Sequence, residues 1–178
     1  MATLAQAGSA RFVPAKFVSI DGGFSIDLPN RTDASVRPIE SVSMGAGTFT
    51  WHLPEGTFTV GFVEGISVLP AEGFRVLNEL AAASEAAQAK TGAKVIDRCE
   101  FSFDGFPGIE LRTERLGGVR SINRFILVGQ KLYVIAADWS VSGNEKSVKK
   151  ILDSFELADP KSLIASRNHV PAETSPLS

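Results

Sequence analysis

Four consecutive runs of strand-forming residues, joined by very short connections, limit the folds open to this chain more than any other feature. Each connection contains Gly or Asp, and connections of this kind join antiparallel neighbours. The sequence therefore predicts a series of antiparallel hairpins. The runs are KVIDRCEFSF (94–103), GIELRTERL (108–116), VRSINRFILV (119–128) and KLYVIAADW (131–139), and the connections are Asp104 to Pro107, Gly117-Gly118 and Gly129-Gln130.

The stretch FDGFPGIEL (103–111) holds two glycines and a proline, so it could be an active-site loop or a plain turn. Asp104 and Gly105 form an Asp-Gly pair, which favours a tight reversal of the chain. Pro107 follows at the start of the next strand, where a missing N–H group is tolerated. We interpret the stretch as a turn and a marker of the fold, not as a site.

The central strands predict a sheet that is apolar on both faces. Adjacent strand residues point to opposite faces, so Phe125 and Ile126 lie on different sides of the sheet. An apolar face needs cover, which predicts packed elements on both sides. Counting outward from the two glycine turns predicts four facing pairs: Ile109 with Ile126, Leu111 with Arg124, Phe125 with Val134, and Ile126 with Tyr133.

Two helices are predicted to supply this cover. Residues 71–92 change to a helical period, are rich in Ala and Glu, and end at Gly92, where a glycine cap belongs. Residues 145–155 carry a second apolar stripe, and Ser142 and Glu145 have capping-box spacing. The stripes consist of Phe74, Leu77, Leu80 or Ala81, Ser84 and Ala87 in the first helix, and of Val148, Ile151, Leu152 and Phe155 in the second.

The first part of the chain adds further strands. KFVSI (16–20) and GGFSIDLP (22–29) form a hairpin around Asp21-Gly22-Gly23. Strand patterns also occur in SVSMG (41–45), TFTWHL (48–53) and GTFTVGFVEG (56–65). The predicted fold class is therefore α+β, with a central antiparallel sheet covered by helices on both faces as an α/β/α sandwich.

One domain is predicted at residues 16–158, between a flexible leader (1–15) and a disordered tail (159–178). Ala5-Gln6-Ala7 has the small-x-small form of a signal-peptidase site, although no apolar region precedes it. A truncated secretory signal would make the protein periplasmic or secreted, and a chance match would leave it cytoplasmic. No apolar run is long enough to predict a membrane span.

Composition argues against several functions. The net charge of −2 gives no basic excess for nucleic acid. A single cysteine, Cys99, excludes an internal disulfide and a Cys-based zinc site, and its strand context predicts a buried, inert thiol. Two histidines, His52 and His169, are too few for a His-based metal site. We therefore expect no metal and no cofactor.

The sequence has no catalytic signature. It contains no G-x-S-x-G pentapeptide, phosphate loop or dinucleotide fingerprint. His52 and Glu55 could form an acid–base pair, but a solvent-facing imidazole at a strand end explains them equally. Asp97, Glu110 and Glu114 could flank a cleft, but solvated strand faces and local ion pairs explain them more simply.

A group of arginines is the one candidate binding site. In the predicted register Arg115 faces Arg120 across a hairpin, and Arg124 lies on the same side further along. Like charges directly opposite each other destabilise a hairpin, so Glu114, solvent or an anionic ligand should offset them. Arginines suit carboxylate and phosphate groups. We therefore predict that Arg115, Arg120 and Arg124 bind an anion or a partner; the alternative is an exposed hairpin end with screened charges.

Four motifs occur in order along the chain: GFSIDLP (23–29), FDGFPGIEL (103–111), NRFILVGQKLYVI (123–135) and ILDSFEL (151–157), the last read as a closing helix. Their order resembles a family of small, mostly exported bacterial proteins with a PsbP-like fold. That fold is named for an extrinsic subunit of photosystem II and is shared with a Ran-binding nuclear import factor. The resemblance covers Gly22 to Leu157 and implies a central antiparallel sheet between helices; it carries over no catalytic residue.

Two functional hypotheses follow. The first is a non-enzymatic interaction or accessory module, outside the cytoplasm, that binds a protein or a cell-envelope partner. The resemblance and the possible signal remnant support it. The second is a protein that binds a small anionic molecule, or an unrecognised hydrolase, with a pocket between the long helix and the sheet near FTWHLPEG (49–56). The oligomeric state is left open.

Overall fold

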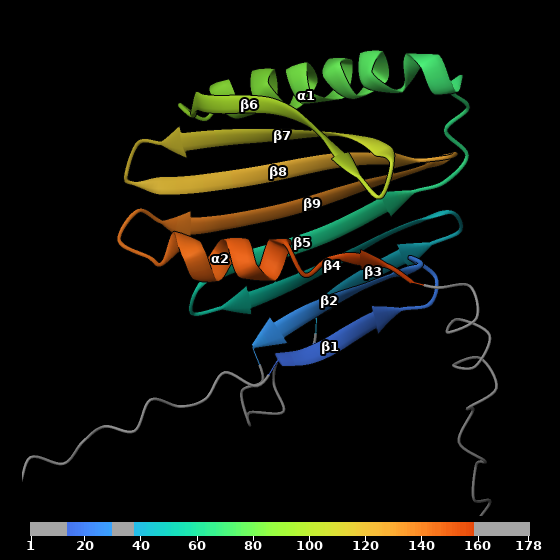
Figure 1. Ribbon diagram of the computed structural model, residues 1–178. Helices are drawn as coiled ribbons and strands as arrows, with labels where there is room; N and C mark the ends of the chain where they lie inside the picture. The colour runs from blue at the N-terminus through green and yellow to red at the C-terminus, as the bar shows by residue number, and fades with distance from the viewer. Residues whose placement is uncertain (1–13, 30–37, 159–178) are drawn as a thin grey trace, which may run out of the picture.

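The computed structural model describes residues 14–29 and 38–158, which form two antiparallel sheets and two α-helices (Figure 1). The large sheet has the strand order β3-β4-β5-β9-β8-β7-β6, and the small sheet has the order β1-β2-β10. The large sheet consists of β3 (Ile39–Ser43), β4 (Ala46–Leu53), β5 (Gly56–Val63), β6 (Lys94–Phe103), β7 (Phe106–Arg115), β8 (Val119–Val128) and β9 (Lys131–Ser140). The small sheet consists of β1 (Pro14–Ser19), β2 (Phe24–Pro29) and β10 (Glu156–Leu157).

The two faces of the large sheet are covered in different ways. The helix α1 (Gly73–Ala89), preceded by the 3-10 turn η1 (Pro70–Glu72), packs on β7 and β8. On the opposite face α2 (Glu145–Leu152) packs on β9 and β2, and the small sheet lies beside α2 (Figure 1). The predicted antiparallel sheet with cover on both faces is confirmed. The prediction of one sheet covered by helices alone is wrong, because strands close most of the second face.

The length of α2 explains why a second sheet is needed. Its eight residues make a helix only about 12 Å long. Seven strands spaced about 4.8 Å apart form a sheet roughly 30 Å wide, so α2 leaves most of that face open. The hairpin of β1 and β2, predicted around Asp21-Gly22-Gly23, covers the remainder with the buried side chains of Phe24, Ile26 and Leu28.

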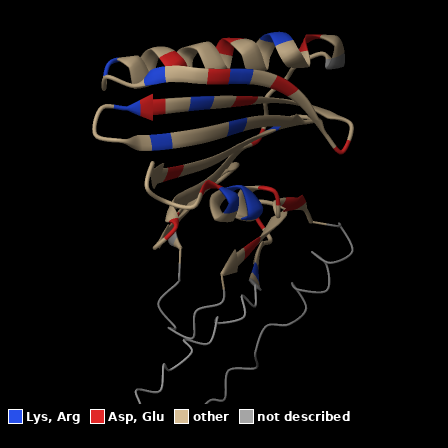
Figure 2. Ribbon diagram, turned by 60° about the vertical axis from the view of Figure 1, so that its left-hand side comes forward, with Lys and Arg blue, Asp and Glu red and all other residues tan. Residues whose placement is uncertain are grey.

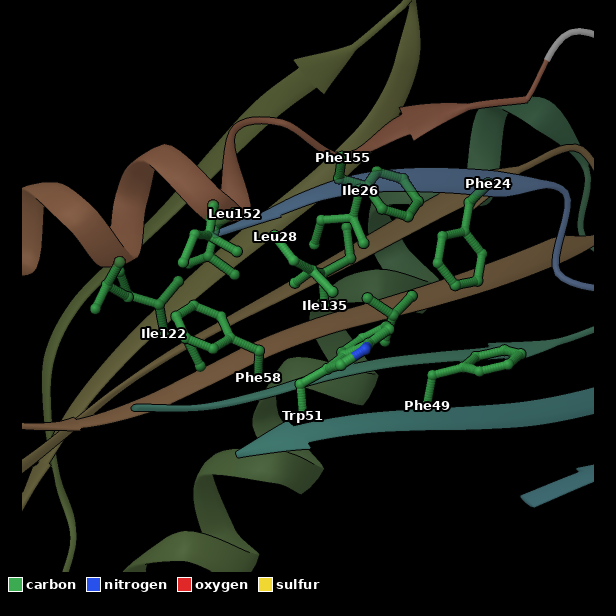
Figure 3. Packing of buried hydrophobic residues seen from close by; sticks show 14 of the residues in the cluster. Phe24, Ile26, Leu28, Phe49, Trp51, Phe58, Ile122, Ile135, Leu152 and Phe155 are labelled. Carbon is green, nitrogen blue, oxygen red and sulfur yellow. The ribbon is translucent and has the colours of Figure 1, made fainter. Parts of the chain in front are cut away.

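A core of aromatic and aliphatic side chains fills the space between the two sheets and α2 (Figure 3). Phe24 stands at its centre. Its ring centroid lies 5.6 Å from that of Phe49 on β4, 6.4 Å from that of Tyr133 on β9 and 5.5 Å from that of Phe155, after α2. A second core beneath α1 consists of Leu77, Ala81, Ile109, Leu111, Phe125, Leu127 and Leu132.

The two-faced apolar character predicted for the central strands is confirmed. Phe125 belongs to the core beneath α1, and its neighbour Ile126 belongs to the core between the sheets. The same pattern does not extend across the sheet. Beyond the area covered by α1, the face carries hydroxyl side chains on β4 and β5, and Thr50 and Thr59 are hydrogen-bonded across the strands at 3.2 Å.

The hairpin registers differ in how well they were predicted. Phe125 faces Val134 as predicted for β8 and β9, and FDGFPGIEL is a turn, with Asp104 and Gly105 between β6 and β7. Between β7 and β8 the predicted register is wrong by one residue. Leu116 joins Gly117 and Gly118 in a three-residue connection, in which both glycines have positive φ angles of 96° and 74°. Ile109 therefore faces Phe125, and Leu111 faces Asn123.

The ends of α2 also differ from the prediction. Asn144, not Ser142, caps its first turn, because the Asn144 side chain accepts hydrogen bonds from the backbone N–H groups of Lys146 and Ser147. The motif ILDSFEL is not helical throughout: α2 ends at Leu152, and Glu156 and Leu157 pair with β2. The four stripe residues predicted for the second helix are all buried, but the last of them, Phe155, lies beyond the end of α2.

The predicted leader and tail fall mainly outside the described residues. Pro14 and Ala15 are the exception, since they belong to β1. No helix in the described part of the chain combines the length and the apolar character needed to cross a membrane.

Candidate interaction surface

The one-residue change of register separates the three predicted arginines. Arg120 and Arg124 share the face of the large sheet that carries α2, whereas Arg115 points to the face that carries α1. Arg115 faces Val119, so its predicted pairing with Arg120 is wrong. Arg120 instead faces Glu114, and Arg124 faces Glu110. The offset converts a repulsive pairing of like charges into two ion pairs.

Glu110 is the centre of the inner ion-pair network. Its side chain is only 7% exposed, and Arg112 donates to Oε1 while Arg124 donates to Oε2, with N–O distances of 2.6 Å and 2.7 Å. Arg124 also donates to Asp153, at the end of α2, at 2.7 Å. Because both carboxylate oxygens of Glu110 accept from arginines, this network fastens α2 to the sheet and is not poised for acid–base work.

The pKa of Glu110 agrees with this structural role. Burial alone would raise the pKa, but hydrogen bonds from Arg124 and Arg112 outweigh it, so the pKa lies below its ordinary value of 4.5. Glu110 is therefore charged near neutral pH. The expectation that local ion pairs explain Glu110 and Glu114 is confirmed, but the expectation of a solvated strand face is wrong for Glu110, which is buried.

The lowered pKa of Glu110 predicts a contribution to stability that depends on pH. Its ionised form stabilises the fold fully above pH 4.5, and this contribution is lost as the pH falls through the lowered pKa, because the unfolded chain takes up the proton first. The free energy of unfolding of the wild type should therefore exceed that of Glu110→Gln at neutral pH, and this difference should disappear in acid. Urea unfolding, followed by tryptophan fluorescence from about pH 7 to about pH 3, measures this difference. A difference in unfolding free energy that stays constant over this range would contradict the prediction.

A second network lies nearer the end of the sheet and is more exposed. The Nε atom of Arg120 lies 3.0 Å from Glu114, and another of its nitrogens lies 3.7 Å from Glu145 on α2. Glu145 also pairs with Lys149 at 3.1 Å. These side chains are 35–42% exposed, so solvent screens their charges. Arg120 thus forms ion pairs with two carboxylates of its own chain.

Arg115 has fewer partners than the other two arginines. Its nearest carboxylate oxygen is Oδ1 of Asp138, at 3.5 Å, and that oxygen also accepts a hydrogen bond from Ser121. The Nε atom of Arg115 is buried and has no hydrogen-bond partner among the described residues. Buried polar groups are nearly always hydrogen-bonded, so this unpaired atom is unusual, while the Arg115 side chain as a whole is 38% exposed.

Apolar side chains are exposed beside Arg115, where β6 begins and β7 ends. Ile96 is 55% exposed at a β-bulge in β6, and Leu116 is 87% exposed in the connection between β7 and β8. A hollow of about 380 Å³ lies between these side chains and the basic residues Lys94 and Arg115. We call this region the tip surface; it consists of Gly92, Lys94, Val95, Ile96, Glu114, Arg115 and Leu116.

Basic residues gather around the tip surface. In the ribbon of Figure 2, Lys and Arg residues (blue) occur where α1 ends, where β6 begins, where β7 ends and where β8 begins. These positions are Lys90, Lys94, Arg115 and Arg120. Carboxylates lie among them, since Arg115 pairs with Asp138, and Arg120 pairs with Glu114 and Glu145.

Cys99 and His52, which were considered for catalysis, are both exposed. Cys99 is exposed, so its predicted burial is wrong; it lies on β6, the edge strand, whereas α2 packs over β9. Partial desolvation, followed by Glu110 and Asp97, raises the pKa of its thiol, which opposes thiolate formation. His52 is exposed on β4 and lies 3.1 Å from the Thr57 hydroxyl.

No group of three or more potential metal ligands occurs within residues 14–29 and 38–158. A second hollow, also of about 380 Å³, lies across β3, β4, β5 and β9. Hydroxyl groups of Ser41, Ser43, Thr48 and Thr59 line it together with apolar side chains. No residue of FTWHLPEG (49–56), near which the sequence predicted a pocket, lines it, but it borders that stretch, because Thr48 precedes Phe49 and Thr59 faces Thr50. No titratable side chain lines it.

Sequence reasoning missed most of the tip surface. It singled out Arg115 but not Lys94, Ile96 or Leu116, because each of these was read as an ordinary strand residue. The available signal was the position of Leu116 between a charged residue and two glycines. An apolar residue at that position either ends a strand or lies exposed in a turn, and only the register decides between the two.

Comparison with solved structures relates this architecture to known proteins. The cyanobacterial PsbP (CyanoP) of Synechocystis sp. PCC 6803 is similar to this chain with a TM-score of 0.50 and 15% identity, covering 88% of this chain and 98% of its own. This likeness confirms, at the level of the fold, the resemblance predicted from the four motifs. No protein-family model matches the chain, and no curated protein matches it.

Two other solved structures are similar at a lower level. The Ran-binding protein Mog1p of Saccharomyces cerevisiae has a TM-score of 0.49 and 10% identity, covering 85% of this chain and 98% of its own. A protein of Bacteroides thetaiotaomicron VPI-5482 has a TM-score of 0.40 and 14% identity over 82% of this chain. The present chain spans about half, 49%, of the length of that protein.

Proposed function

We propose that this chain, which has the PsbP-like fold, is a non-enzymatic interaction module that binds a protein partner through its tip surface. The partner belongs to the cell envelope or its surroundings. This location rests on the sequence alone, through Ala5-Gln6-Ala7, which lies outside the described residues.

The observation that carries the proposal is the exposure of Ile96 and Leu116 beside a hollow flanked by Lys94 and Arg115. Exposed aliphatic side chains gathered in one place mark interaction sites more often than isolated ones do. Arginine is enriched at the centres of protein interfaces, where its fork of donors meets carboxylates. The tip surface combines both features at the exposed end of a rigid sheet.

Arg115 is the predicted site residue that this proposal uses. Arg120 and Arg124 already pair with carboxylates of their own chain, and they position Glu114 and α2. Direct binding of a ligand by Arg120 or Arg124 stays a prediction. A small-molecule site is the second candidate function, and the hydroxyl-lined hollow across β3, β4, β5 and β9 is the observation that favours it.

Replacement of the exposed apolar side chains tests the proposed function. Proteins captured from the native cell-envelope fraction by the wild type should be purified and their binding measured against Ile96→Ser and Leu116→Ser. Each variant should weaken binding by about 30-fold if these side chains are interface hot spots. Both side chains are exposed, so the variants should unfold at nearly the wild-type temperature.

Met44→Ser is the matched control. Met44 is a fully exposed apolar residue in the turn between β3 and β4, at the opposite end of the large sheet (Figure 1). It should leave binding unchanged. A partner that binds both tip variants with wild-type affinity, or that loses affinity only with Met44→Ser, would remove the tip surface as the site of function.

A further inference from the structure

We propose that the tip surface recognises a peptide segment in which one carboxylate lies next to an apolar side chain. This inference rests on the proposed function and adds the chemistry of the partner. The carboxylate would bind Arg115 and Lys94, and the apolar side chain would pack on Ile96 and Leu116.

Unused donors at the tip surface point to an acidic ligand group. Arg115 has a buried Nε atom with no acceptor among the described residues, and its one carboxylate neighbour, Asp138, is 3.5 Å away and shared with Ser121. Lys94 faces Glu114 across β6 and β7, but the Glu114 carboxylate is held by Arg120 at 3.0 Å. The Arg115 side chain is 38% exposed, so the exposed end of its guanidinium could donate to a planar carboxylate at the hollow.

The shape of the chain at the tip keeps the apolar side chains in place. A β-bulge between Val95 and Asp97 lifts Ile96 out of the regular pairing of β6 with β7. Leu116 leans toward the loop after α1, since a Cβ atom added to Gly92 would lie 3.7 Å from its Cδ1 atom. Ile96 and Leu116 therefore both border the hollow, one from a bulge in β6 and the other from the connection between β7 and β8.

The size and charge of the hollow favour a single carboxylate. At about 380 Å³ it lies at the small end of ligand pockets, which range over about 300–1,000 Å³, and it has room for one or two side chains. Glu114 also lines it and would repel a doubly charged phosphate more strongly than a singly charged carboxylate. Membrane surfaces are bound by clusters of about 4–8 basic residues. Only Lys94 and Arg115 among the lining residues are basic.

Binding of synthetic peptides tests the inference. The probe is a short, fluorescently labelled peptide with blocked ends and one glutamate flanked by leucine and phenylalanine. Two matched peptides replace the glutamate by glutamine, or the leucine and phenylalanine by serine. Fluorescence anisotropy should show that the acidic apolar peptide binds about tenfold more tightly than either matched peptide. High salt should reduce the difference in affinity between the glutamate and glutamine peptides.

Two charge variants complete the experiment. Arg115→Gln should remove the preference for glutamate over glutamine while leaving binding of the glutamine peptide unchanged. Arg75→Gln is the control, because Arg75 is an exposed arginine on the first turn of α1, paired with Glu72 and Glu79, at the other end of the sheet. It should keep the preference.

The outcomes separate this inference from the proposed function. Equal affinity of the wild type for the glutamate and glutamine peptides, or no binding of any peptide, overturns the carboxylate inference. The proposed function still stands if Leu116→Ser weakens binding of the purified partner. Leu116-dependent binding to vesicles of phosphatidylglycerol, with no binding of the peptides, would assign the tip surface to lipid and overturn the inference as well.

Discussion

Replacing Phe24 with alanine is expected to lower the free energy of unfolding by about 3–5 kcal/mol, the range for deletion of a buried aromatic ring. Phe24 is completely buried and contacts rings of Phe49, Tyr133 and Phe155. These partners lie on β4, on β9 and after α2, so one ring joins the small sheet, the large sheet and the end of the domain (Figure 3). Urea unfolding at neutral pH measures the loss.

Phe74→Ala is the control for the loss of a phenylalanine ring. Phe74 is 40% exposed on the first turn of α1, so its replacement should cost less than about 1 kcal/mol. If the variant Phe24→Ala does not fold at all, Phe24→Leu retains most of the apolar volume and should cost less. Equal effects of Phe24→Ala and Phe74→Ala would show that the contact between the two sheets does not govern stability.

Replacing Glu110 with glutamine is expected to cost about 2–3 kcal/mol at neutral pH, because it leaves two arginines facing a neutral group. The Arg124 side chain is only 16% exposed, so water would solvate its unpaired charge poorly. The amide group of glutamine also places a donor where one arginine donates. The loss should loosen α2, since Arg124 joins Glu110 to Asp153. Hydrogen exchange of the α2 amides should therefore increase more than that of α1.

Glu114→Gln is the matched control on the same strand and the same face. Glu114 also faces an arginine of β8, but its side chain is 42% exposed. Its replacement should cost less than about 1 kcal/mol. If both variants lost the same free energy, burial of the Glu110 pair would not be the source of its effect. If neither lost any, the inner network would be dispensable for folding.

The hairpins show where sequence reasoning succeeds and where it fails. Gly129-Gln130 is a two-residue turn, and counting outward from it correctly placed Phe125 opposite Val134. Gly117-Gly118 looked like the same kind of turn, but Leu116 joined the loop and shifted the register by one. A shift of one residue exchanges the two faces of a strand relative to its neighbour. The predicted cluster of Arg115 and Arg120 failed for this reason alone.

The candidate site depends on the same register. Arg115 was predicted as a binding residue, and the structure places it at the tip surface, away from the other two arginines. Leu116 reads as the last residue of a strand in the sequence, yet it is exposed in a connection. Ile96 reads as a strand residue, yet it lies at a bulge. A local pattern cannot show a bulge or an extended loop, because these depend on how the next strand pairs.

Local patterning alone was enough to establish the antiparallel order of the last four large-sheet strands, the two helices, and the apolar character of both faces of the central strands. Periodicity and turn residues act over a few neighbours, so they can be read without the fold. Three features were decided only when distant segments met: the second sheet, the burial of Glu110 between two arginines, and the exposure of Ile96 and Leu116 beside Arg115. Each depends on which surfaces remain uncovered after packing, and that is a property of the whole chain.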